Sequence, residues 1–170
     1  MHPGRATACL KRDDNTVLVH RLDISDRFRY TILVPDSEVP TEQARAILPK
    51  SYPLSVAAGN GAHAIMMVEA LRTGSLELLR EAADDLLHEP YRSRLIPNYS
   101  TVRQIVLDHT DGAFLISGSG STCIFISHDS LAPEAVSEIM ELPDGWQIVE
   151  TNIARGGIEI KENGVWRKSI

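Results

Sequence analysis

A short loop of alternating serine and glycine constrains the fold of this chain more than any other feature. Residues 113–127 read AFLISGSGSTCIFIS, so an apolar run leads into the loop and another leads out of it. This pattern predicts strands at residues 113–117 and 122–127. Glycine lets the backbone approach a ligand closely and take positive φ angles. Successive N–H groups in such a loop can hold an anion, so a phosphate-handling loop and a plain tight hairpin both remain open.

The composition is that of one globular domain. The 170 residues are 43% hydrophobic and 24% charged, as in ordinary folded proteins. The net charge of −6 disfavours contact with a nucleic-acid backbone, and no apolar run approaches the ~20 residues of a membrane span. The start, MHPGRATACLKRDD, has charged residues where a signal peptide needs an apolar core. We therefore expect a cytoplasmic protein with no nucleic-acid or membrane partner.

The cysteines and histidines predict neither a disulfide framework nor a metal site. Cys9 and Cys123 are far apart and form no CxxC pair, so we expect both to be reduced and packed as small apolar residues. His88 and Glu89 begin like a zinc-protease HExxH motif, but position 92 is arginine.

Turn formers and apolar periods divide the chain into strands and helices. Two β-prone runs, 6–10 and 16–22, flank a polar turn, which predicts a hairpin. Further strands are expected at residues 29–35, 146–151 and 157–161. Helices are expected at residues 41–48 capped by Thr41, at 53–73 closed by Gly74, from Ser75 to a stop at Pro90, from Ser100 to 109, and at 133–140. Residues 91–98 are expected to form a loop.

The order of these elements predicts the fold class. From residue 29 the chain reads strand, several helices, strand, strand, helix, strand, which matches a ferredoxin-like split βαβ sandwich. Two helices joined by residues 73–75 form a helical hairpin inserted after the first strand. Antiparallel strands with helices on one face make the class α+β. No internal repeat or linker divides the chain.

Two basic segments could contact a negatively charged ligand. Arg92 and Arg94 lie beside a proline-rich turn, and Arg45 lies one helical turn beyond Thr41. A guanidinium held in place can grip a carboxylate or phosphate through two parallel hydrogen bonds. Solvated surface arginines are the plain alternative, and the pattern of residues leaves both open.

Four motifs follow one another along the chain. Residues 41–49 read TEQARAILP, residues 85–99 contain DLLHEPYR and LIPNY, residues 115–122 read LISGSGST, and residues 150–155 read ETNIAR. They resemble S/T-x-x-A-R-x-x-L-P, D-x-x-x-E-P-x-R with L-I-P-x-Y, G-x-S-G-S-G-P-T and D-T-x-G-A-R. These are motifs of the GHMP small-molecule kinases, and within them of homoserine kinases. The resemblance covers nearly all of the chain and corresponds to the family's carboxyl-terminal half.

The resemblance implies a part in phosphoryl transfer. Homoserine kinases move phosphate from ATP, with Mg²⁺, to the hydroxyl of L-homoserine, a step towards threonine. In the family, arginines that match Arg45 and Arg92 hold the amino-acid substrate. The loop that braces the phosphate-binding region of the other domain matches Ser117, Gly118, Ser119, Gly120 and Thr122. The resemblance assigns no catalytic residue and no metal ligand to this chain. Such positioning is most of what phosphoryl transfer asks of a protein.

The chain also departs from the family. These 170 residues lack the P-x-x-x-G-L-G-S-S-A-A loop that cradles the ATP phosphates and the carboxylate that holds Mg²⁺. The family's H-P-D-N segment is reduced to His2-Pro3-Gly4-Arg5, Ser121 replaces a proline, and Ile153 replaces a glycine. We therefore expect residues 1–170 to be the C-terminal domain, with 1–28 a remnant hairpin of an absent ATP-binding N-terminal domain. Neither ATP nor Mg²⁺ is expected to bind this chain tightly, and no kinase activity is expected from it alone.

One helix is expected to carry an apolar face, since Leu54, Ala58, Gly61, Ile65 and Val68 recur at helical spacing. Loss of an amino-terminal half would also uncover apolar surface, and such patches bind partners. We expect a homodimer, or pairing with the missing half in cis or in trans. Two other functions remain open: a non-catalytic amino-acid-binding or regulatory ferredoxin-like module, and the C-terminal half of another GHMP kinase with a different hydroxylated substrate.

Overall fold

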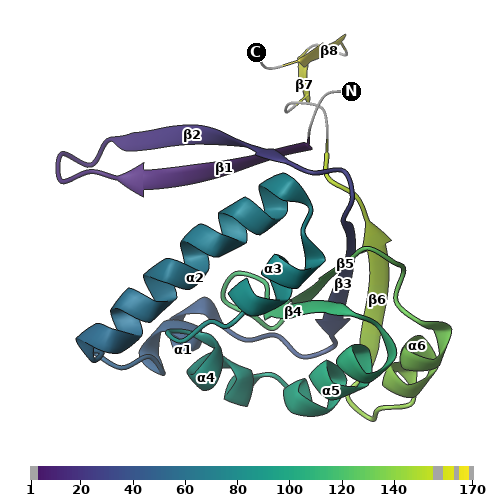
Figure 1. Ribbon diagram of the computed structural model, residues 1–170. Coiled ribbons are helices and arrows are strands. Elements are labelled where there is room, and N and C mark those ends of the chain that lie inside the picture. The colour runs from purple at the N-terminus through teal and green to yellow at the C-terminus, as the bar shows by residue number, and fades with distance from the viewer. Residues whose placement is uncertain (1–3, 155–158, 163–164, 169–170) are drawn as a thin grey trace.

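A computed structural model describes residues 4–154, 159–162 and 165–168 of the chain (Figure 1). It opens with a hairpin in which β1 (Gly4–Lys11) pairs antiparallel with β2 (Val17–Ile24), as predicted. The hairpin runs alongside helix α2 (Leu54–Thr73) and outside the main sheet. Most side chains of β2 are therefore exposed.

Four antiparallel strands form the main sheet. They are β3 (Arg29–Pro35), β4 (Gly112–Ile116), β5 (Cys123–Ser127) and β6 (Trp146–Thr151), in the spatial order β4-β5-β3-β6. Each lies within one residue of its predicted position, so the predicted strand order along the chain is confirmed. A separate two-stranded sheet pairs β7 (Glu159–Glu162) with β8 (Val165–Lys168). The predicted start of that last strand, residue 157, lies outside the described residues, as do Arg155 and residues 1–3 of the motif comparison.

The helices are α1 (Thr41–Ala46), α2, α3 (Leu76–Ala82), α4 (Glu89–Arg92), the 3₁₀ turn η1 (Ser93–Leu95), α5 (Tyr99–His109) and α6 (Pro133–Met140). As predicted, α2 ends at Gly74, and Ser75 caps α3 by accepting a hydrogen bond from the backbone nitrogen of Leu78 at 3.2 Å. The two helices pack together as a helical hairpin. Within the described ranges, none of the helices combines the length and the apolar character needed to cross a membrane.

Three predicted helix boundaries are wrong. Pro90 lies in the first turn of α4 and does not end α3, because a helix start does not need the N–H that proline lacks. The segment predicted as a loop therefore contains the second half of α4 and all of η1. Pro40, not Thr41, precedes the first turn of α1, and no side chain caps that helix. Asn98, not Ser100, precedes α5, with a φ of 49° that asparagine tolerates.

Apolar side chains fill both faces of the main sheet. Successive residues of a strand point to opposite faces, so each strand serves two cores. The face that packs against α5 and α6 buries Leu33, Val102, Phe114, Phe125 and Ile139. The face that packs against α2 and α3 buries Phe28, Tyr30, Ala70, Leu79 and Ile126. The loop between β4 and β5 is thus held at the edge of a sheet that is packed on both sides.

The two cysteines lie in different surroundings. Cys123 is fully buried, and burial is the main cause that raises the pKa of its thiol to about 12. Cys9 in β1 is exposed, so the prediction that both cysteines would pack among apolar residues is wrong for Cys9. An isolated two-stranded hairpin cannot cover either of its own faces. Both cysteines are free thiols, as predicted.

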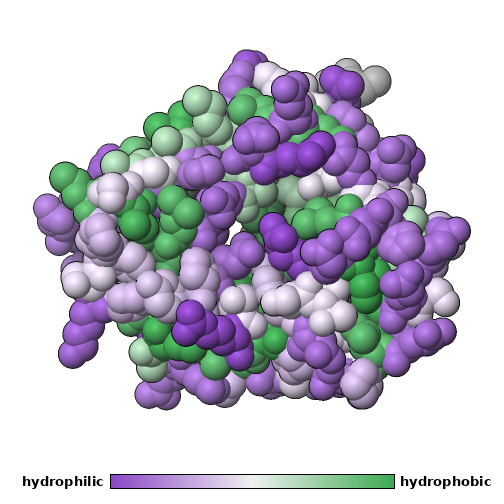
Figure 2. Space-filling model, turned by 60° about the horizontal axis from the view of Figure 1, so that its bottom comes forward, coloured by the Kyte–Doolittle hydropathy of each residue, from purple (hydrophilic) through white to green (hydrophobic). Residues whose placement is uncertain are grey.

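The apolar face predicted for α2 is largely uncovered. Leu54, Ile65 and Val68 have exposed fractions of 84%, 70% and 42%. Met67 and Ala70, which lie on the other side of the helix, pack against the sheet instead. Figure 2 shows apolar surface, in green, on the side of the molecule where α2 lies in Figure 1. We refer to Leu54, Ile65, Met66 and Val68 as the α2 surface; its size and exposure are typical of an interaction site.

Candidate functional site

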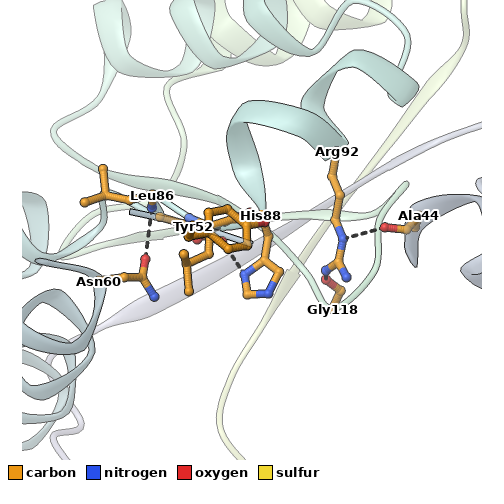
Figure 3. A network of polar contacts seen from close by, with 9 residues as sticks. Ala44, Tyr52, Asn60, Leu86, His88, Arg92 and Gly118 are labelled. Carbon is orange, nitrogen blue, oxygen red and sulfur yellow. Dashed lines mark hydrogen bonds and ion pairs between the residues drawn. The ribbon is translucent and has the colours of Figure 1, made fainter. Parts of the chain in front are cut away.

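Arg92 connects three segments that are distant in the sequence (Figure 3). Its Nε atom donates a hydrogen bond to the carbonyl oxygen of Ala44 in α1 at 3.2 Å. Its Nη1 atom donates another to the carbonyl oxygen of Gly118 in the glycine-serine loop at 3.0 Å. Three of the five N–H donors of a guanidinium then remain for other partners. The segments around Arg45, Arg92 and Gly118 therefore meet in one place.

The glycine-serine loop is a tight, internally bonded turn. Ser117 donates its backbone N–H to the carbonyl of Thr122 at 2.9 Å, and Gly120 donates to the carbonyl of Ser117 at 3.2 Å. Gly118 and Gly120 have φ angles of 63° and 87°, which side chains other than glycine rarely adopt. Hairpin geometry thus explains both glycines. The loop keeps only part of its capacity for an anion: among the described residues, the N–H groups of Gly118 and Ser119 have no hydrogen-bond partner.

A serine that the sequence comparison marked as a departure anchors the loop. The hydroxyl of Ser121, which is 8% exposed, donates a hydrogen bond to the carbonyl oxygen of Ser37 at 2.6 Å. Ser37 follows β3, so this contact ties the loop to the strand that crosses the middle of the sheet. A proline at position 121 has no hydroxyl and could not make this contact. The departure therefore has a structural role in this chain.

Arg45 lies beside this meeting point with its charge unpaired. It occupies the last turn of α1, one residue after the carbonyl that Arg92 binds. Its side chain is exposed, and in the described part of the chain its guanidinium forms neither a hydrogen bond nor an ion pair. A cation near a helix C-terminus is stabilised by the helix dipole, although α1 is short. Arg45 is thus available to a ligand, whereas Arg92 is partly committed to the fold.

Side-chain hydrogen bonds fix the turn that leads into α4 (Figure 3). Asp85 Oδ1 accepts from the backbone nitrogens of Leu87 and His88 at 2.9 and 3.0 Å, and Oδ2 lies 3.1 Å from His88 Nδ1. Asn60 Oδ1 accepts from the backbone nitrogen of Leu86 at 2.9 Å. Tyr52 donates its hydroxyl to the carbonyl of Leu87 at 2.7 Å. The start of α4 is therefore held by Asp85 from its own turn, by Asn60 on α2 and by Tyr52.

Burial and hydrogen bonding act in opposite directions on the two carboxylates next to this turn. Burial raises the pKa of Asp85, but the hydrogen bonds from the backbone of His88 and Leu87 outweigh it and leave the pKa below its usual value. Burial raises the pKa of Glu89, although Tyr99 and Arg103 favour its charged form. The carboxylate of Glu89 lies 3.8 Å from Arg103. Both groups help to hold α4 in place. Among the described residues, neither forms a hydrogen bond or an ion pair with Arg45.

Sequence reasoning missed the residues that hold Arg92 in place. The sequence indicates no role for Asn60 or Tyr52. Asp85 was quoted as part of a motif, and its position three residues before His88 is the spacing of a side chain that caps a turn. That spacing was the one local signal available. The contacts of Asn60 and Tyr52 span 26 and 35 positions and required the fold.

The described residues offer few grouped ligands for a metal ion or a phosphate. In the ranges that the structure covers, no group of three or more His, Cys, Asp or Glu side chains could hold a metal ion. Two backbone N–H groups of the glycine-serine loop are already bonded within the loop. A cavity of about 440 Å³ adjoins Gly120, Ser121 and Thr122, but its charged lining residues are Asp36 and Glu38, which would repel phosphate. No step of a reaction can be derived from these residues through ATP.

Comparison with known proteins gives the family. Residues 67–142 match the GHMP kinase C-terminal family. The homoserine kinase of Gloeobacter violaceus is 38% identical over 74% of this chain and 42% of its own length. That of Clostridium acetobutylicum is 31% identical over 88% of this chain and 51% of its own length. The crystal structure of homoserine kinase from Cytophaga hutchinsonii superposes with a TM-score of 0.71 at 28% identity, over 85% of this chain and 48% of that one.

The chain spans about half the length of the curated relatives it matches. The match falls on their carboxyl-terminal halves, as the motifs had predicted. The meeting of Arg92 with the glycine-serine loop lies inside the region shared with these relatives, since the family match covers both. The chain therefore belongs to the GHMP kinase family and carries its C-terminal domain, in the form found in proteins named homoserine kinases.

Proposed function

We propose that this chain supplies the amino-acid-binding side of a homoserine kinase-type site, where ATP phosphorylates L-homoserine to O-phospho-L-homoserine on the way to threonine. The observation that carries the proposal is the pair of hydrogen bonds that holds Arg92 between α1 and the glycine-serine loop. They hold a guanidinium with three spare donors against the helix turn that also carries Arg45. Relatives that share this region are named homoserine kinases.

The two arginines have complementary roles in this proposal. Arg92 is pre-positioned by the fold, so it can bind the α-carboxylate of homoserine with little loss of side-chain entropy. Arg45 is exposed and adds a second positive charge from α1. The loop residues Ser117, Gly118, Ser119, Gly120 and Thr122 brace the phosphate end of the site. Gly118 and Ser119 contribute the loop's unused N–H donors.

ATP and Mg²⁺, which GHMP kinases use, would be held mainly by an amino-terminal half, in cis or in trans. Among the described residues no group of three or more His, Cys, Asp or Glu side chains could hold a metal ion. In this proposal residues 1–170 are one C-terminal domain, and residues 1–28 are a hairpin that pairs with that half. The strand order β4-β5-β3-β6 supports the finer assignment of the sheet to the ferredoxin-like split βαβ class. The chain alone would then turn over no ATP.

The test is isothermal titration of the purified chain with L-homoserine and, separately, with Mg-ATP. We expect saturable heat with homoserine, none with Mg-ATP, and loss of the homoserine heat in Arg92→Lys, since lysine cannot make two parallel hydrogen bonds. Arg94→Lys is the matched control: this arginine lies two residues away, over the ring of Tyr91. Equal homoserine affinity in all three proteins would contradict the proposal.

A second titration uses the chain mixed with the separately prepared amino-terminal half of the Gloeobacter violaceus homoserine kinase. ADP release that depends on homoserine, appears only in the mixture and is lost in Arg92→Lys would support the kinase assignment. Mevalonate and a phosphorylated sugar alcohol, offered in place of homoserine, test whether another GHMP substrate fits better.

A second candidate is a non-catalytic amino-acid-binding or regulatory module, which needs no cluster of metal ligands of the kind that the described residues lack. It predicts homoserine binding by the chain alone and no ADP release in the mixture.

A further inference from the structure

The short helix α4 cannot fix the position of Arg92 by itself. It contains four residues, and the chain leaves it through the three-residue turn η1. A single helical turn fixes many backbone angles for few hydrogen bonds, so it is unstable without outside support. Within this turn Tyr91 and Arg92 donate to the carbonyl of His88 at 3.1 and 2.9 Å, and Ser93 donates to the carbonyl of Glu89. The support for Arg92 must come from residues outside α4.

That support comes from two side chains on the opposite side of the turn from the guanidinium (Figure 3). Asn60 holds the backbone nitrogen of Leu86, and Tyr52 holds the carbonyl of Leu87. The tip of the Arg92 side chain is bound to Ala44 and Gly118, and the backbone from which it extends is bound through Asn60 and Tyr52. Arg92 is therefore fixed at both ends.

The glycine that precedes Asn60 makes the first of these contacts possible. A Cβ atom at Gly59 would lie 3.2 Å from Cδ1 of Leu86, which is tighter than most such contacts. The absence of a side chain at position 59 leaves room for the Leu86 side chain beside the 2.9 Å hydrogen bond to Asn60. Gly59 and Asn60 of α2 thus both face the turn.

We propose that Asn60 and Tyr52 are positioning residues for Arg92: by clamping residues 86–87 they set the guanidinium for a carboxylate ligand. This rests on the proposed function only in the choice of ligand. Neither residue contacts the ligand in this arrangement, since both lie on the far side of the turn from Ala44 and Gly118. Loss of Asn60 or Tyr52 would leave the charge of Arg92 unchanged, but the guanidinium would occupy a wider range of positions.

Tyr52→Phe and Asn60→Leu each remove one clamp with little change in volume. Tyr91→Phe is the matched control, because Tyr91 packs edge-on against Tyr52 with ring centroids 6.2 Å apart and its hydroxyl forms no recorded hydrogen bond in the described chain. The first readout is the ¹⁵N-labelled Nε–H signal of Arg92, which donates to Ala44 in the folded chain. The second is titration with L-homoserine.

We expect the Arg92 Nε–H to exchange with water about tenfold faster in Tyr52→Phe and Asn60→Leu than in the unmodified chain or Tyr91→Phe. The backbone amide of Val102, fully buried in α5, should keep its exchange rate and so exclude global loosening. Homoserine affinity should fall by a similar factor.

An unchanged Arg92 signal in Tyr52→Phe and Asn60→Leu would overturn the positioning role, and so would equal acceleration at Val102. If Asn60→Leu does not fold, Tyr52→Phe decides alone. The outcome for the proposed function is separate: a faster Arg92 signal with no homoserine binding by any of the proteins would confirm the clamp and reject the amino-acid site.

Discussion

The Nη1 atom of Arg92 donates a 3.0 Å hydrogen bond to the carbonyl oxygen of Gly118, 26 positions later in the chain. The same guanidinium binds the carbonyl of Ala44, 48 positions earlier. Both acceptors are backbone carbonyl oxygens. The position of the guanidinium therefore depends on how the backbone of α1 and of the loop is folded, and not on the side chains there. Arg92, which is proposed to bind the ligand, thus also connects α4, α1 and the glycine-serine loop.

Because of this double role, Arg92→Ala should lower both stability and ligand affinity. The substitution removes two hydrogen bonds, a part-buried one to the carbonyl of Ala44 and an exposed one to the carbonyl of Gly118. We expect the free energy of unfolding to fall by ~1–3 kcal/mol. Urea denaturation followed by circular dichroism measures it. Arg94→Ala, which removes a nearby arginine without these bonds, should stay within ~0.5 kcal/mol of the unmodified chain; equal losses in the two variants would contradict the structural role.

Arg45→Ala should separate binding from stability. Arg45 is exposed and unpaired within the described chain, and alanine is at least as good a helix former. We expect the free energy of unfolding to change by less than ~0.5 kcal/mol, while the affinity for L-homoserine falls. Calorimetric titration and urea denaturation of the same preparation make the comparison. A variant that binds homoserine as tightly as the unmodified chain would remove Arg45 from the site.

The strands were predictable from the sequence because their signals are local. Residues 29–35 and 146–151 are short apolar runs bounded by turn formers, and the structure places β3 and β6 there. The segment after α3 was not predictable in this way. Pro90 is compatible both with the end of one helix and with the start of the next, and the turn before it is held by Asn60 and Tyr52, which are far away in the sequence. The same holds for the candidate site. Its motifs could be recognised in the sequence, whereas the contacts of Asn60 and Tyr52 with the turn before α4 could not.

The lowered pKa of Asp85 predicts a pH-dependent contribution to stability. Burial raises this pKa, but hydrogen bonds from the backbone of His88 and Leu87 lower it by more. A carboxylate whose pKa is lower in the folded state stabilises the fold above the ordinary aspartate range, and this contribution is lost as the pH falls through the folded-state pKa. Asp85→Asn keeps an acceptor but loses the charge. It should therefore be less stable than the unmodified chain at pH 7, with the difference shrinking towards pH 3.

Urea denaturation between pH 7 and pH 3 tests this sign. The control is Asp84→Asn, at an exposed neighbour that takes no part in these hydrogen bonds. A stability difference between Asp85→Asn and the unmodified chain that stays constant or grows as the pH falls would show that the charge of Asp85 is not responsible.

The two glycines of the loop should respond unequally to alanine. Gly118→Ala places a Cβ atom in open space, so its cost is only that of a φ of 63°, about 1 kcal/mol. Gly120→Ala adds a contact of 3.3 Å with Cδ1 of Ile96, which is buried in the core. We expect Gly120→Ala to lower the melting temperature more than Gly118→Ala. The reverse order in a calorimetric scan would mean that the loop has a different conformation in solution.

The α2 surface should drive self-association of this chain when no amino-terminal half is present. Leu54, Ile65, Met66 and Val68 are all exposed, and burying them against a second copy would remove apolar area from water. We expect sedimentation velocity to show a dimer that dissociates on dilution, and Ile65→Glu to be monomeric, since a charge would be buried in the contact. Met140→Glu is the control: Met140 is 60% exposed on α6, so its replacement should leave the dimer intact. A monomer at high concentration, or equal association of both variants, would show that α2 does not mediate the contact.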